Sequence, residues 1–115
     1  VTVLEARDLR NKELLFGKND PYVELQLGAS KVETKVHKDG GSAGVWNETH
    51  VLEFPEGIVA LDVNVYDEDR LKLDDLIGRV EILLHETVEK GMTEGWFDLQ
   101  NRRANKQAGR IHLKL

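Results

Sequence analysis

The segment YDEDRLKLDDLIG, at residues 66–78, carries four aspartates within nine positions. These aspartates are Asp67, Asp69, Asp74 and Asp75. Like charges a few ångströms apart repel one another unless a cation or solvent lies between them. Calcium prefers such hard oxygen ligands, because it takes about six to eight oxygens in a tolerant geometry. A solvated acidic turn is the alternative, and this segment alone does not decide between the two.

An alternating run leads directly into the acidic segment. Val59, Leu61, Val63 and Val65 stand at every second position and share one side of the chain. Strict alternation over residues 59–66 predicts a half-buried strand. The aspartates are therefore expected in a loop at the end of that strand.

Length and composition favour one globular domain over residues 1–115, because 40% of the residues are hydrophobic. The sequence lacks the run of about 20 apolar residues that a membrane span needs, and it lacks a leader-like start, so we expect a soluble chain. A net charge of -5 argues against a nucleic-acid partner. The absence of cysteine excludes disulfides and favours the cytosol.

Short alternating or β-branched runs recur along the chain, separated by turn residues. The predicted strands span residues 1–6, 22–27, 31–37, 48–54, 59–66, 78–84, 96–99 and 109–115. Residues 85–90 are a helical candidate that ends at Gly91. Residues 11–20 and 38–47 are predicted long loops, since they are rich in Gly, Asn and Asp. Eight short strands and at most one brief helix predict an all-β sandwich.

Three segments, in this order, carry a resemblance to a known family. They are Gly17-Lys18-Asn19-Asp20-Pro21-Tyr22-Val23, Val45-Trp46-Asn47-Glu48, and Asp67-x-Asp69 followed by Asp75 and Ile77-Gly78. Together they resemble the C2 domain, the module found in protein kinase C and synaptotagmin, and the likeness covers essentially the whole chain. It implies an eight-stranded antiparallel β-sandwich with calcium held by loops at one end. Because GRIHLKL comes last, the chain resembles the circularly permuted, type II topology of the C2 domains seen in phospholipase C and the novel protein kinase C enzymes.

The resemblance also implies a set of metal ligands. Asp20 matches an acidic position of the family's first loop, and Asp67, Asp69 and Asp75 match those of its third loop. The first loop departs from the pattern, because Leu14 stands where the family has its first Asp. Glu13 is adjacent and one methylene longer, and whether it substitutes as a ligand is open. Asp74 is expected to be a solvated neighbour of the site.

Apolar residues in the same two loops are candidates for membrane contact. Leu15, Phe16 and Leu71 are expected to enter the bilayer interface, where buried apolar area strengthens attachment. Leu73 is a further candidate, with the alternative that it packs back onto the loops. Lys31, Lys35 and His37 are predicted on the outer face of one strand, where they either face solvent or meet anionic lipid headgroups.

Catalysis finds no support in the sequence, because a G-x-S-x-G elbow, a phosphate-binding Gly loop and a cysteine nucleophile are all missing. The predicted function is a calcium-dependent phospholipid-binding and membrane-targeting module, with calcium as its cofactor. We expect a cytoplasmic protein that becomes peripheral to anionic membranes when calcium binds. Strand-like residues at both ends favour a module of a longer protein, whose other domains are candidate partners. The alternative is a calcium-independent C2 domain that serves as a protein-interaction surface.

Overall fold

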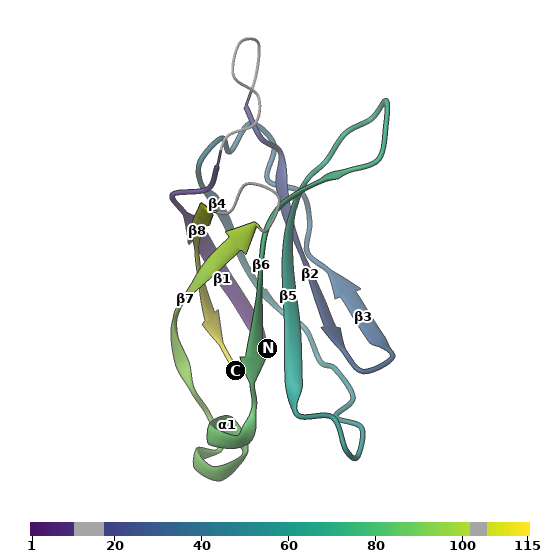
Figure 1. The fold of residues 1–115 in the computed structure, drawn as a ribbon, viewed down its shortest axis with the longest axis vertical. Coiled ribbons are helices and arrows are strands. Elements are labelled where there is room, and N and C mark those ends of the chain that lie inside the picture. The colour runs from purple at the N-terminus through teal and green to yellow at the C-terminus, as the bar shows by residue number, and fades with distance from the viewer. Residues whose placement is uncertain (11–17, 102–105) are drawn as a thin grey trace.

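The computed structural model describes residues 1–10, 18–101 and 106–115, and this part contains eight strands and one short helix (Figure 1). The strands are β1 (Thr2–Arg7), β2 (Pro21–Leu27), β3 (Ser30–Glu33), β4 (Gly44–Thr49), β5 (Ala60–Asp67), β6 (Asp75–Leu83), β7 (Glu94–Asn101) and β8 (Lys106–Lys114). The helix is α1 (His85–Lys90). Strand pairs are all antiparallel in the described residues, which confirms the predicted all-β class.

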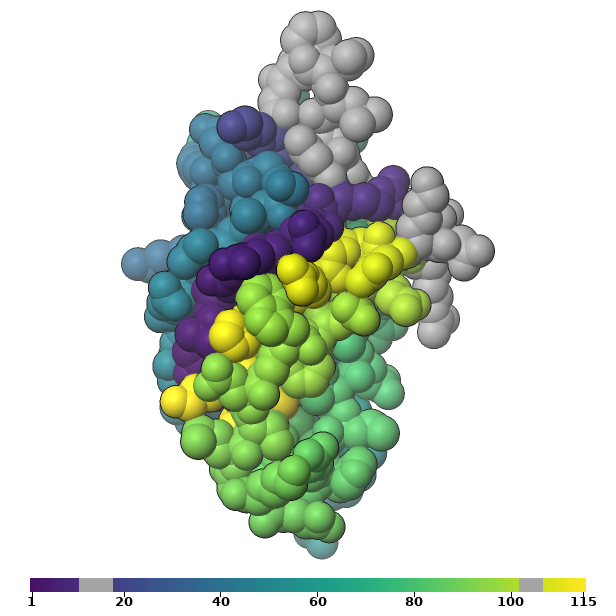
Figure 2. Space-filling model, turned by 90° about the vertical axis from the view of Figure 1, so that its left-hand side faces the viewer, coloured from purple at the N-terminus to yellow at the C-terminus, as the bar shows by residue number. Residues whose placement is uncertain are grey.

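The strands form one curled sheet in the order β3-β2-β5-β6-β7-β8-β1-β4. Between β6 and β7 the described residues form a single register pair, Arg79 with Gln100. The sheet therefore folds into two layers, β3-β2-β5-β6 and β7-β8-β1-β4, which enclose the core. Figure 2 shows β1, β8 and β7 side by side on the outer face of the second layer.

Alternation along the central strands builds the core. On β5, Leu61, Val63 and Val65 are buried, and on β8 Ile111 and Leu113 are buried opposite them in the second layer. β8 lies between β7 and β1, so the last strand of the chain occupies a central place in its layer. This is the arrangement expected of the permuted topology.

Most predicted strand boundaries differ from the observed ones by a few residues, and two strands differ most. The strand predicted at residues 48–54 lies earlier, at β4, because Val45 and Thr49 pair with Glu5 and Thr2 of β1. Trp46 packs against the core from this strand, and Gly44 leaves room for its ring. The small residues before Val45 therefore hid the start of a strand.

The strand predicted at residues 31–37 is shorter, because β3 ends at Glu33. The Thr34 side chain takes over the pairing there, since Thr34 Oγ1 accepts the Val23 N–H at 2.9 Å. The Thr34 N–H in turn donates to the Val23 carbonyl at 2.8 Å. Lys35 and His37 consequently lie beyond the strand that was expected to carry them.

The helix has the predicted bounds and ends at Gly91. Gly91 adopts a φ of 83°, in the left-handed region that favours glycine, and its N–H donates to the Thr87 carbonyl. Within the described residues, no helix has the length and apolar character needed to cross a membrane.

Candidate functional site

The acidic loop joins β5 to β6 at the end of the sandwich opposite α1 (Figure 1). The register places Asp67, the last residue of β5, opposite both Pro21 of β2 and Asp75 of β6. Asp20 directly precedes Pro21, so strand pairing alone brings Asp20, Asp67 and Asp75 to the same end of the molecule. Asp69 follows two residues after Asp67 in the loop.

Asp67 is the most deeply placed of these acids, with 2% of its surface exposed. Its Oδ1 accepts the Asp20 N–H at 2.8 Å, and the Glu68 N–H donates to the Asp20 carbonyl at 3.1 Å. A buried carboxylate needs such partners, because burial of an uncompensated charge is costly. These bonds tie the start of β2 to the acidic loop.

Asn19 and Asp20 bring in a third segment, the loop that precedes β4. Asn19 is buried, and its Nδ2 donates to the carbonyls of Arg10 at 2.7 Å and Gly41 at 3.0 Å. Asp20 Oδ1 accepts the Asp39 N–H at 2.8 Å. Asn19 was predicted only as part of the loop at residues 11–20, and its role in joining these loops was missed, although it stands beside the candidate ligand Asp20.

Asp69 directs its carboxylate into its own loop. Its Oδ1 accepts the N–H of Leu71 at 2.8 Å and that of Lys72 at 3.3 Å. Its Oδ2 lies 3.9 Å from Lys72 Nζ, which is exposed. Groups of the same loop, two amides and the Lys72 ammonium, therefore partly offset the negative charge of Asp69.

Asp74 was predicted to be a solvated neighbour, and that prediction was wrong. Its Oδ1 accepts the Asp69 N–H at 2.8 Å, and its Oδ2 accepts the Tyr22 hydroxyl at 2.5 Å. The Tyr22 ring stacks on Tyr66 with 5.5 Å between the ring centroids. Burial and the nearby Asp74 carboxylate raise the pKa of Tyr22 above its ordinary value. Asp74 thus holds the acidic loop to β2.

Carboxylates fit calcium in their chemistry, because all the converging ligands are hard oxygens. Their present arrangement is looser than a metal cage, since no three His, Cys, Asp or Glu side chains gather as a metal site in the part of the chain described. Several of the oxygens bond to loop amides instead. Glu13, the open candidate, lies outside the described residues.

The tip of the acidic loop is apolar and exposed. Leu71 and Leu73 are 97% and 90% exposed, so neither packs back onto the sandwich. The other two candidates for membrane contact, Leu15 and Phe16, lie outside the described residues.

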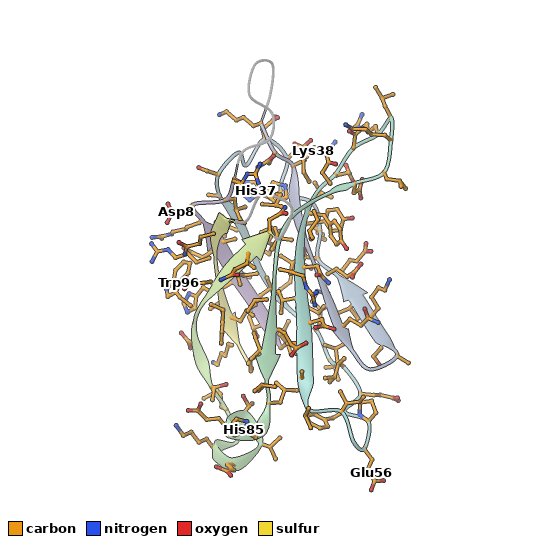
Figure 3. All side chains as sticks on the ribbon, viewed as in Figure 1. Asp8, His37, Lys38, Glu56, His85 and Trp96 are labelled. Carbon is orange, nitrogen blue, oxygen red and sulfur yellow. The ribbon has the colours of Figure 1, made fainter. Side chains whose placement is uncertain are left out.

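The three basic candidates do not form one cluster on a strand. Lys31 lies on β3, with its Nζ 3.8 Å from Glu24 Oε2, whereas Lys35 and His37 follow the end of that strand. His37 Nδ1 accepts the Val45 N–H at 2.8 Å, so the ring carries its proton on Nε2 and supports the start of β4. Figure 3 shows His37 at the loop end of the molecule, beside Lys38.

Comparison with known proteins agrees with this architecture. Residues 1–99 match the family model of the C2 domain. Extended synaptotagmin-1 of Rattus norvegicus is 33% identical over 123 residues, which cover 100% of this chain and 11% of that protein. The 16 kDa phloem protein 2 of Cucurbita maxima is 31% identical, over 96% of this chain and 80% of that protein. A solved, calcium-bound structure of two C2 domains of extended synaptotagmin 2 has a TM-score of 0.83 and 29% identity, over 98% of this chain and 42% of that one.

An antiparallel sandwich with converging loops at one end, together with this match, defines the class, and the chain belongs to the C2 domain family. Domains of this family are typically non-catalytic modules that bind lipid. The chain spans about 11% of the extended synaptotagmin-1 that it matches.

Proposed function

We propose that this C2 domain binds anionic phospholipid membranes through its loop end, and that calcium held by Asp20, Asp67, Asp69 and Asp75 controls the binding. The observation that carries the proposal is the strand pairing that brings Asp20, Asp67 and Asp75 to one end of the molecule, next to the loop that carries Asp69 and the exposed Leu71 and Leu73. The calcium-bound form of a solved relative, extended synaptotagmin 2, supports it. The chain would then act as a cytoplasmic module that is peripheral to the membrane.

Charge explains why a cation would control attachment. An acidic loop end repels an anionic membrane surface as well as its own carboxylates. Bound among these carboxylates, calcium would supply positive charge and open coordination positions for phosphate oxygens. Asp67 and Asp20 form the anchored part of such a site, because their hydrogen bond fixes them to the base of the loop.

The apolar tip would supply the second part of the attachment. Leu71 and Leu73 project from the loop that carries Asp69, so neutralisation of the loop brings them to the bilayer interface. Burial of apolar surface there adds to the electrostatic attraction.

Cosedimentation with phosphatidylserine-containing vesicles, in calcium and in chelator, tests this proposal. We expect calcium-dependent sedimentation with these vesicles and little with phosphatidylcholine alone. Asp67→Asn with Asp69→Asn should abolish the calcium response.

Glu56→Gln with Glu89→Gln is the matched control, because it removes the same charge and should retain the response. Glu56 and His85 of α1 both lie at the end of the molecule opposite the acidic loop (Figure 3), and Glu89 belongs to α1. Equal sedimentation of the parent chain in calcium and chelator would contradict the proposal.

A calcium-independent C2 domain that acts through protein contacts is the second candidate. Two observations favour it: Leu14 replaces the family's first Asp, and the described residues contain no ready-made metal cluster. The same experiment separates the candidates, since this one expects the chain to remain in the supernatant in both calcium and chelator.

A further inference from the structure

Two strand edges face each other without pairing on one side of the sandwich. In the described residues β6 and β7 share the single pair Arg79–Gln100, while β6 pairs with β5 and β7 pairs with β8. Beyond that pair the two strands diverge toward α1 (Figure 1). Each therefore presents one unpaired side to the other, and we call the space between them the β6–β7 wedge.

The hydrogen-bond alternation of antiparallel strands shows which backbone groups of β7 face the wedge. Thr93 and Leu115 exchange two backbone bonds, at 2.7 and 3.3 Å. The register with β8 continues unbroken to Leu99, so Gly95 and Phe97 are also in bonded pairs. The N–H and carbonyl groups of Glu94, Trp96 and Asp98 must then point away from β8, into the wedge.

The same reasoning applies to β6. The Leu84 N–H donates to the Val59 carbonyl at 2.9 Å. By alternation, the backbone groups of Ile82, two positions earlier, also form hydrogen bonds with β5. The backbone groups of Leu83 and Glu81 face the opposite way, toward β7. Arg79 stands two positions before Glu81, so its backbone groups also face β7. Its pairing with Gln100 agrees with this.

The wedge is hollow and partly apolar. A groove of about 430 Å³ lies at its α1 end, lined by residues that include Ile82, Leu83, Met92, Trp96 and Phe97. A second groove of about 310 Å³ lies near the Arg79–Gln100 pair. Leu83, Met92 and Trp96 are exposed. Apolar side chains beside unused backbone donors and acceptors are the features that an added strand requires.

Charge selects the class of peptide. The two grooves carry four carboxylates, those of Glu81, Glu86, Glu94 and Asp98. Their two cations, Arg79 and Lys90, are each bonded to a carboxylate, Arg79 to Asp62 and Lys90 to Glu86. Two basic groups of β8 lie nearby: Arg110, opposite Asp98 in the register, is bonded to Asp8, and His112 Nε2 lies 3.1 Å from Glu94 Oε2. Four carboxylates against two cations still leave the grooves with an excess of negative charge, so a complementary partner is basic.

We propose that the β6–β7 wedge binds an extended peptide of alternating basic and apolar residues by strand addition to β7. Its backbone pairs with Glu94, Trp96 and Asp98. Its apolar side chains face the side of Phe97, and its basic side chains lie beside the Glu94 and Asp98 carboxylates as cross-strand pairs. This site is on the flank of the sandwich and is independent of calcium.

Trp96 is pre-organised for such contact. Its ring stacks on His112 with 4.8 Å between centroids, and the Arg110 guanidinium lies 5.0 Å from the ring centroid. Side chains held in place before binding lose less conformational freedom on association. The outer edges of β3 and β4 offer single unpaired strands, whereas the wedge offers two that face one groove.

Amide hydrogen exchange with the blocked peptide acetyl-Lys-Val-Lys-Val-Lys-Val-amide tests the proposal. We expect the peptide to slow exchange at the amides of Trp96 and Asp98 by about tenfold or more. The Gly95 and Phe97 amides, which already bond to β8, should be unchanged. Absence of binding, or binding that leaves the Trp96 and Asp98 amides unprotected, would overturn the proposal. So would equal binding of acetyl-Lys-Lys-Lys-Val-Val-Val-amide, because charge alone would then suffice.

A proline variant isolates the backbone contribution. Asp98→Pro removes an N–H that faces the wedge and leaves the β7–β8 bonds in place. Asp98→Ala is the matched control, since it removes the same carboxylate and keeps the N–H. We expect Asp98→Pro to bind the peptide at least about fivefold more weakly than Asp98→Ala, as the loss of one backbone hydrogen bond requires. Equal affinities, with both variants folded by thermal melt, would overturn strand addition.

Discussion

Asp74 positions the acidic loop through both of its carboxylate oxygens. One oxygen accepts the Asp69 N–H and the other accepts the Tyr22 hydroxyl, so the loop is fastened to β2 at the point where the aspartates gather. A hydrogen bond to a charged group is stronger than one between neutral groups. The position of Asp69 therefore depends on Tyr22.

Tyr22→Phe removes this fastening with little change in shape. We expect it to lower the free energy of unfolding by about 1–2 kcal/mol, because Asp74 loses a charge-assisted bond. It should also weaken calcium binding. Urea unfolding and calcium calorimetry measure these two effects.

Tyr66→Phe provides the control for this change. It removes a hydroxyl from the stacked neighbour, for which the described residues offer no hydrogen-bond partner. Equal losses in the two variants would show that the Tyr22–Asp74 bond does not hold the loop.

The family motif named Asp20 and Asp67 as neighbours, and it did not predict how they are held. Asp20 and Asp67 were chosen from their motif positions, and strand pairing brings them together. Asp74 was assigned to solvent because its partner, Tyr22, lies 52 positions away in the sequence. A long-range bond of this kind leaves no local pattern.

At the scale of elements, the loop between β5 and β6 carries its acidic and its apolar residues in different parts. Its base carries the anchored acids, while its tip carries Leu71 and Leu73. Exposed apolar side chains at a loop tip do nothing for the core, so their removal should leave the fold intact.

Leu71→Ala with Leu73→Ala should weaken calcium-dependent vesicle binding by about tenfold or more, because each leucine loses buried apolar area at the bilayer. Calcium affinity without lipid should be unchanged. Vesicle titration and calorimetry measure the two quantities.

Val51→Ala with Val59→Ala is the matched control, since these valines are 92% and 65% exposed and lie away from the acidic loop. Both variants should keep the parent's melting temperature. Vesicle binding by the leucine variant as tight as that of the parent would contradict a role for the loop tip.

Alternation was a reliable guide for the central strands and a poor one at the margins. It predicted β2 and β5 because both have one face on the core. It failed for β4, since this strand turns Gly44 and Trp46 inward and leaves Val45 exposed. It also overextended β3, where the Thr34 side chain replaces a strand bond.

At the scale of the whole molecule, the sandwich carries two surfaces with different proposed roles. The loop end gathers acids and exposed leucines, and the flank between β6 and β7 offers backbone edges. The circular permutation does not change the arrangement of these two surfaces. β8 occupies the middle of its layer even though it comes last in the chain. A membrane contact at one end and a peptide contact on the flank are therefore compatible.

The proposed function requires calcium and anionic lipid to bind at one coupled site. Thermodynamic linkage requires that, if calcium tightens lipid binding, lipid tightens calcium binding by the same factor. A calorimetric titration of calcium, with and without phosphatidylserine vesicles, measures this coupling directly. We predict that calcium affinity rises by about tenfold or more when the vesicles are present, within the usual range of such couplings. A calcium affinity that is the same with and without vesicles would contradict coupled binding of calcium and lipid.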